Sequence, residues 1–183
     1  MRRRTRKEIL AHCYTQLVAA WFHSPKSFII LVQNYFLSRG FCGSLVVMAA
    51  ISHFGRLDIL IKNAGVMLLG PVLDAETEDW RRMFNVNVMR LMYAMHAALP
   101  GTVEQGGGHV VNISSAAGRF TGPPSAVYSA TKFAVNSFSE GLRKQVSEKA
   151  ARVTVIEPGA VATELQSHIT HEARARRPGH NSS

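Results

Sequence analysis

Short apolar runs alternate with longer segments of helical periodicity from about residue 57 onward. Residues 58–63, 109–114 and 152–157 are mostly apolar, and glycine or proline borders each run, so we predict three strands. Strands that alternate with helices form parallel sheets with the helices packed on them. The pattern therefore predicts an α/β fold with a parallel sheet.

Two long helices are predicted between these strands. The first begins near Thr77 and ends before Pro100, and the second runs from about residue 125 to residue 149. The polar residue Asn87 interrupts the apolar stripe of the first helix. The first stripe comprises Trp80, Phe84, Val88, Leu91, Met95 and Leu99, and the second comprises Tyr128, Lys132, Val135, Phe138 and Leu142.

The amino-terminal part of the chain has no clear periodicity. Residues 28–37 and 45–48 are apolar enough for strands, but their pattern does not separate strand from helix. Residues 1–22 resemble a signal peptide in outline, although polar residues interrupt the apolar stretch and no clean cleavage site follows. We therefore assign no structure to residues 1–50.

The positive charge of the chain lies mainly at its two ends. Of the formal charge of +9, +5 lies in residues 1–7 and +2 in residues 172–177, which leaves +2 for residues 8–171. Solvated tails explain this distribution better than a nucleic-acid or membrane partner, and we predict neither. The 2 cysteines suggest no secreted disulfide framework, so we expect a cytoplasmic protein.

The residues with the strongest chemical signal are Tyr128 and Lys132. Four-residue spacing on a helix places the phenol and the ammonium on the same face, where the positive charge favours the phenolate and allows proton exchange near neutrality. Ser115 follows the second predicted strand, and residues 63–65 (Asn-Ala-Gly) follow the first. The carboxyl ends of parallel strands are where open α/β sheets bind ligands.

Together with Asn87, these motifs resemble the short-chain dehydrogenase/reductase family from about Ala50 to about Glu172. The resemblance implies an incomplete Rossmann-like, doubly wound parallel sheet, with three confident strands plus helices. It divides the chain into a divergent basic and apolar segment (residues 1–50), a catalytic half (51–172) and a polar tail (173–183). The implied activity is NAD(P)-dependent hydride transfer between a nicotinamide cofactor and a small carbonyl or secondary alcohol substrate.

The resemblance also implies a role for each catalytic residue. Tyr128 is the general acid/base, and Lys132 lowers the pKa of Tyr128 and bonds the nicotinamide ribose. Ser115 holds the substrate carbonyl oxygen, and Asn87 positions a water in the proton relay. Taken singly, Ser115 is better explained as a helix or turn cap, Asn63 as a turn former and Thr163 as an N-cap, and Asn87 also fits a residue that bonds backbone beneath the sheet.

The resemblance also implies some of the residues that contact the cofactor. The Asn-Ala-Gly turn matches the family's turn beside the adenosine half, although Lys62 stands where the family usually has a further Asn. A Pro-Gly-x-x-x-Thr segment follows the third strand and, by resemblance, packs on the nicotinamide. The implied cofactor-binding residues are Asn63, Ala64, Gly65, Tyr128, Lys132, Pro158, Gly159, Val161 and Thr163. We expect NADP, with NAD as the alternative.

Two features of the sequence depart from the family. It has no Thr-Gly-x-x-x-Gly-x-Gly string, because Gly40 and Gly43 lack that spacing, and the carboxyl end is short, so we expect a truncated chain of doubtful activity. The strand at residues 58–63 then needs cover for one edge, from residues 28–37, residues 45–48 or a partner subunit.

Two alternatives remain open at this stage. The chain can be a non-catalytic remnant or interaction protein that pairs through its two long helices, which are also the expected surface of a homo-oligomer. His168 and His171 have a spacing that metal ligands can use, but a polar helix face explains them better, so we predict no metal site.

Overall fold

The computed structural model describes residues 20–24, 27–32, 42–73 and 75–159. Within these residues, five strands form one sheet in the order β1-β2-β3-β4-β5, in which β1 is antiparallel to β2 and the other neighbours are parallel. The last three strands confirm the three predicted from the sequence. The strands are β1 (Ala20–Ser24), β2 (Ser27–Val32), β3 (Ile59–Lys62), β4 (Gly108–Ile113) and β5 (Ala151–Ile156).

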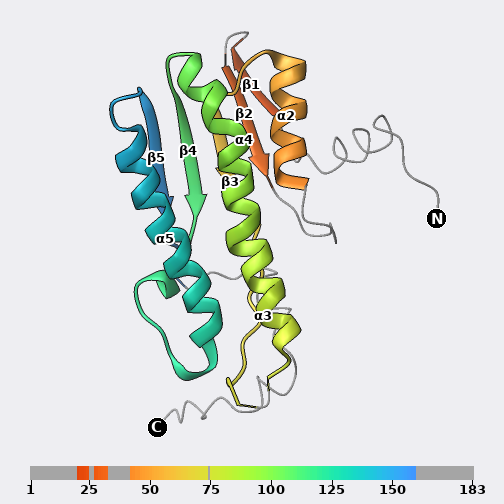
Figure 1. The fold of residues 1–183 in the computed structure, drawn as a ribbon, viewed down its shortest axis with the longest axis vertical. Helices are drawn as coiled ribbons and strands as arrows, with labels where there is room; N and C mark the ends of the chain where they lie inside the picture. Colours follow the sequence, from red (N-terminus) through yellow and green to blue (C-terminus); the bar gives the residue numbers. More distant parts are fainter. Residues whose placement is uncertain (1–19, 25–26, 33–41, 74, 160–183) are drawn as a thin grey trace, which may run out of the picture.

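Three long helices pack side by side on one face of this sheet (Figure 1). They are α2 (Cys42–Phe54), α4 (Arg90–Glu104) and α5 (Ala126–Val146). A further helix, α3 (Thr77–Phe84), joins α4 through the short π-helical segment η1 (Asn85–Met89) and lies beyond the carboxyl ends of the strands (Figure 1). The described residues thus form one helical layer on a mainly parallel sheet. This arrangement agrees with the predicted α/β fold, an incomplete Rossmann-like sheet.

The main hydrophobic core lies between the sheet and these three helices. In β3 and β4, Leu60 and Val110 are buried while Ile59 and Val111 are only partly buried, which is the alternation expected of strands with one covered face. Full burial of each large apolar side chain contributes roughly 1.5–3 kcal/mol. The buried members of the core are Val47, Ala50, Leu57, Leu60, Leu91, Ala94, Met95, Ala98, Val110, Val135, Leu142, Val146 and Ala151.

The first long helix differs from its prediction at two places. It does not end before Pro100, because α4 continues to Glu104 with Pro100 inside it and on its exposed side. The missing N–H there removes one backbone hydrogen bond, while the buried Thr102 hydroxyl donates to the Ala98 carbonyl at 2.8 Å.

Phe84 was expected on the buried stripe but is 41% exposed, whereas its neighbour Met83 is 1% exposed. The cause is η1, since a π-helical turn holds more residues than an α-helical turn and rotates α3 relative to α4.

The amino-terminal segments take two different structures. Within residues 28–37, the described part belongs to β2, which pairs in parallel with β3 so that Ile30 lies opposite Leu60. This strand covers the edge of β3 that needed protection. Residues 45–48 lie in α2 and therefore form a helix and not a strand. Across the described residues, every helix is too short or too polar to cross a bilayer.

Candidate active site

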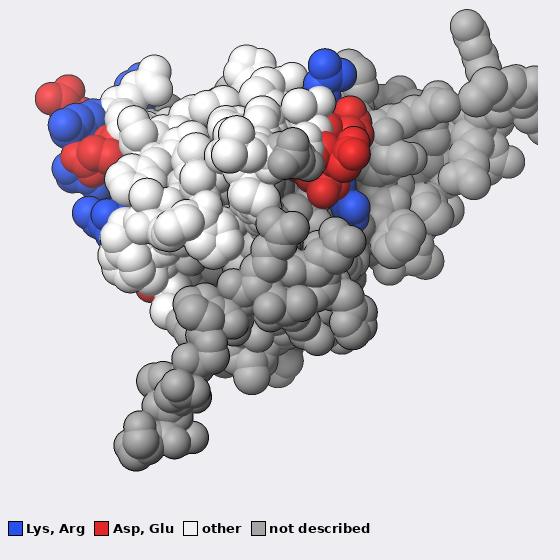
Figure 2. Space-filling view, turned by 90° about the horizontal axis from the view of Figure 1, so that it is seen from below, with Lys and Arg blue, Asp and Glu red and all other residues white. Residues whose placement is uncertain are grey.

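The predicted site residues gather at the carboxyl ends of β3 and β4, where the following loops meet η1 and the first turns of α5. Figure 2 views the molecule from this end and shows mostly uncharged residues, with charged residues at two sides. Exposed apolar side chains occur on two of these loops, with Leu73 79% exposed and Phe120 67% exposed. The described surface around the site is therefore mainly uncharged.

Asn87 ties the loop after β3 to the helical layer. Its side chain is 3% exposed, and its Oδ1 accepts a hydrogen bond from the Val66 backbone N–H at 2.8 Å. Its Nδ2 donates to the Val66 carbonyl at 2.9 Å and to Thr131 Oγ1 of α5 at 3.0 Å. The interpretation that Asn87 bonds backbone is thus correct for these contacts.

Ser115 and Tyr128 lie together at the end of β4. Ser115 has extended backbone and begins the 3₁₀ turn η2 (Ala116–Gly118), where its Oγ accepts a hydrogen bond from the Ala117 N–H at 3.1 Å. The Tyr128 side chain, which is 4% exposed, lies near enough to the Ser115 hydroxyl for this group to lower the pKa of the phenol. Ser115 therefore caps a turn and also lies near the phenol.

The pKa of Tyr128 differs from the expectation. Burial raises the pKa of this phenol, and the nearby Ser115 hydroxyl lowers it by a smaller amount. Lys132 is also largely buried, and burial lowers its pKa to about 8. Its Nζ donates to the Ile113 carbonyl at 3.1 Å and lies 5.8 Å from the centroid of the Tyr128 ring. At this distance Lys132 does not offset the effect of burial, and the pKa of the phenol stays raised.

The turn at residues 63–65 lies beside this pair. A Cβ placed on Gly65 would be 3.5 Å from Asn87 Oδ1 and 3.7 Å from Lys132 Nζ. Asn63 is exposed, and Ala64 is partly buried. A side chain at Gly65 would therefore be in van der Waals contact with Asn87 and Lys132.

The segment after β5 also lies at the carboxyl end of β4, beside Ser115. Its Pro158 carbonyl accepts a hydrogen bond from the Ala116 N–H at 2.9 Å, directly after Ser115, and Gly159 is exposed. The predicted contacts Val161 and Thr163 lie outside the described residues, as do His168 and His171.

These residues fit one half of a nicotinamide cofactor. Lys132 Nζ has donor hydrogens beyond the one that the Ile113 carbonyl accepts, which suits a ribose hydroxyl, and Gly65 places no side chain beside it. The fit to the pyrophosphate half is poorer, because the sequence has no glycine-rich string of the kind that binds it at a helix N-terminus.

Two buried residues beside the site were not among the predicted site residues. Thr131 is 0% exposed and links Asn87 to α5, where its hydroxyl donates to the Tyr128 carbonyl at 2.7 Å. Lys62 is 2% exposed at the end of β3, and burial together with the charges of Arg90 and Lys132 lowers its pKa to about 7. The signal for Lys62 was present in the sequence, since it is a cation at the end of a buried strand.

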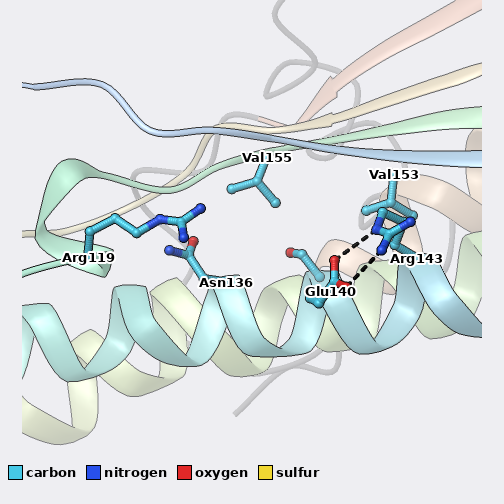
Figure 3. Close-up of a pocket in the computed structure, with 7 residues that line it drawn as sticks. Arg119, Asn136, Glu140, Arg143, Val153 and Val155 are labelled. Carbon is cyan, nitrogen blue, oxygen red and sulfur yellow. Dashed lines mark hydrogen bonds and ion pairs between the residues drawn. The ribbon is translucent and has the colours of Figure 1, made fainter.

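A separate pocket lies between α5 and β5, away from Tyr128 (Figure 3). Val153 and Val155 extend from β5 toward α5, and Asn136 lines the pocket from the helix. Its two arginines already have partners, because Arg119 is paired with Glu157 at 2.8 Å and Arg143 with Glu140 at 2.8 Å. We assign no ligand to this pocket.

Comparison with known proteins identifies the family. The profile of the short chain dehydrogenase family matches residues 42–174. An uncharacterized oxidoreductase of Staphylococcus saprophyticus is 39% identical over 127 residues, which are 68% of this chain and 52% of that protein. The chain therefore belongs to the short-chain dehydrogenase family. It spans about half the length of the curated relatives it matches.

Solved structures agree with this assignment. A short-chain dehydrogenase from Streptomyces avermitilis has a TM-score of 0.67 at 33% identity, covering 72% of this chain and 49% of that chain. A gluconate 5-dehydrogenase from Burkholderia cenocepacia, in complex with NADP and tartrate, has a TM-score of 0.66 at 26% identity over 70% of this chain and 50% of its own. A family member from Burkholderia phymatum, in complex with NAD, has a TM-score of 0.67 at 29% identity over 77% and 50%.

The contacts of Asn87 predict a large effect on stability. Asn87→Ala should lower the free energy of unfolding by about 2–4 kcal/mol, because it leaves the buried N–H and carbonyl of Val66 without partners. Urea denaturation measures the change. Asn85→Ala is the matched control, since Asn85 is exposed on the same π-helical turn and its loss should cost no more than about 0.5 kcal/mol. Equal losses in the two variants would contradict the role of Asn87.

Proposed function

We propose that the protein is a dehydrogenase or reductase that transfers hydride between a nicotinamide cofactor and a carbonyl or secondary alcohol substrate. The observation that carries this proposal is the position of the buried Tyr128 side chain, which lies near the Ser115 hydroxyl and has Lys132 Nζ 5.8 Å from its ring centroid. Membership of the short-chain dehydrogenase family supports it. Two hydroxyl groups that meet at a strand end can bind one carbonyl oxygen between them.

In this mechanism the chain orients the substrate and provides the proton donor. When bound, the nicotinamide group donates or accepts the hydride. Ser115 donates a hydrogen bond to the substrate oxygen, and Tyr128 gives that oxygen a proton in reduction or removes one in oxidation. Lys132 would bond the ribose and, as an ammonium, would favour the phenolate form of Tyr128. Asn87 keeps the loop after β3 in place and positions a water for the relay.

The cofactor contacts belong to the same proposal. Asn63, Ala64 and Gly65 would lie along the adenosine side, and the segment that begins at Pro158 and Gly159 would pack on the nicotinamide. Solved relatives in complex with NADP and with NAD make both cofactors reasonable. We favour NADP, as the sequence resemblance does. Action in the cytoplasm is part of the proposal.

We further propose that the protein forms homo-oligomers through α4 and α5. Both helices present apolar side chains to solvent, because Tyr93 of α4 is 41% exposed and Phe133 of α5 is 46% exposed. Large apolar side chains on neighbouring helices are typical of surfaces that pair with another subunit.

Removal of one hydroxyl tests the catalytic assignment. Tyr128→Phe should lower the rate of NADPH-dependent carbonyl reduction by about a hundredfold or more, since it removes the general acid and leaves the ring in its apolar surroundings. Tyr93→Phe is the matched control, because Tyr93 lies exposed on α4 and its variant should keep the full rate. Circular dichroism shows whether both variants are folded. Turnover retained by folded Tyr128→Phe would disprove the assignment.

Cofactor titration separates the enzyme from the non-catalytic alternative, which the missing glycine-rich string favours. We expect NADPH at micromolar concentration to quench protein fluorescence or receive energy from it. Lys132→Met should weaken this response, whereas Lys144→Met should not, because the Lys144 side chain is 71% exposed on α5. A wild-type chain that gives no response would favour a remnant that folds without binding cofactor.

A further inference from the structure

Lys62 is a buried amine that the proposed chemistry does not use. It is the last residue of β3 and is 2% exposed, and no described residue accepts a hydrogen bond from its Nζ. A buried ammonium without an acceptor is strongly unfavourable, since it loses its hydration and gains nothing in exchange. The side chain therefore has a strong tendency to lose its proton or to gain an anionic partner.

The groups around Lys62 supply positive charge and one free acceptor. Arg90 of α4 and Lys132 of α5 are the charged groups that act on it, and both disfavour a further positive charge. On the neighbouring strand, Asn112 lies opposite Lys62 in the parallel register and is 0% exposed. Asn112 Nδ2 donates to Ser139 Oγ at 2.9 Å, but Asn112 Oδ1 accepts no hydrogen bond from the described residues.

A negative group on Lys62 would satisfy all of these surroundings at once. Its charge would be favoured by the positive charges of Arg90 and Lys132 that act on Lys62, and an N–H retained on the same nitrogen could donate to an acceptor such as Asn112 Oδ1 on the neighbouring strand. Carbamate formation produces this combination, because a carbamate carries one negative charge and keeps one N–H. The reagent is carbon dioxide, which is small and uncharged and so can reach a buried amine.

We propose that Lys62 is a site of carbamate formation by carbon dioxide. The lone pair of the neutral Nζ forms a bond to the carbon of carbon dioxide, one C–O π bond opens onto oxygen, and the nitrogen releases one proton to solvent. The product is a neutral N–H with a terminal carboxylate, and no electron is gained or lost in the step. The negative charge then lies beside Lys132 and favours its ammonium form. The modification needs no cofactor and does not depend on the proposed dehydrogenase activity.

Isotope-labelled bicarbonate provides the direct test. The full-length chain is equilibrated with ¹³C-bicarbonate at pH 8 without cofactor, and we expect one protein-bound carbamate carbon resonance in carbon NMR, near one per chain. The resonance should disappear in Lys62→Met and in Lys62→Asn, which carries the residue usual in the family. It should remain in Lys149→Met, since Lys149 is exposed after α5. No resonance in the wild-type chain, or one that persists in both Lys62 variants, would overturn the proposal.

The dependence on pH gives a second test. Because burial and its cationic neighbours lower the pKa of Lys62 to about 7, the amine is mainly neutral at pH 8 and mainly protonated at pH 6. Occupancy should therefore fall steeply as the pH decreases through 7, and an occupancy that does not change would contradict the assignment. If the Lys62 variants fail to fold, alkylation of the wild-type carbamate with an oxonium salt and peptide mass spectrometry locates the label. A label on another lysine would also overturn the proposal.

Discussion

The amide of Asn87 is the interaction on which the rest of the site depends, because it joins three segments that are far apart in the sequence. It bonds both backbone groups of Val66 in the loop after β3 and the hydroxyl of Thr131 in α5. Its position within a π-helical turn aims the side chain at that loop. The relative placement of Tyr128, on α5, and of the turn at residues 63–65 follows from this one buried contact.

A second constraint is electrostatic. Lys62, Arg90 and Lys132 are each at most 5% exposed, and they come from a strand and two helices that meet at the carboxyl end of the sheet. Burial of like charges lowers stability and lowers the pKa of the lysines. Lys132 has a use in the proposed chemistry that explains its burial. Lys62 has none there, and for that reason an anionic modification is a physically motivated assignment for it.

Much of the fold was predictable because burial on one face leaves a simple pattern. The apolar runs at residues 58–63 and 109–114, each bordered by glycine, predicted two of the strands, and the four-residue spacing of Tyr128 and Lys132 predicted their shared helix face. Segments whose structure depends on distant partners were not predictable. Residues 27–32 become a strand by pairing with β3, and no local periodicity records that pairing.

The details of the site were less accessible for similar reasons. The exposure of Phe84 arises from one π-helical turn, which shifts the helix phase without an obvious sequence signal. The raised pKa of Tyr128 depends on how deeply the ring is buried, which the sequence does not record. The contact between Asn87 and Thr131 joins residues 44 positions apart, and its two members could be identified as polar residues on buried helix faces but not as a pair.

A double-mutant cycle between Asn87 and Thr131 tests the central contact most directly. The free energy of unfolding is measured for Asn87→Ala, Thr131→Val and the double variant. If the two side chains hold η1 against α5, their effects should be coupled by at least about 0.5 kcal/mol, with the double variant less destabilised than the sum of the single variants. Strictly additive losses would contradict the view that this contact assembles the site.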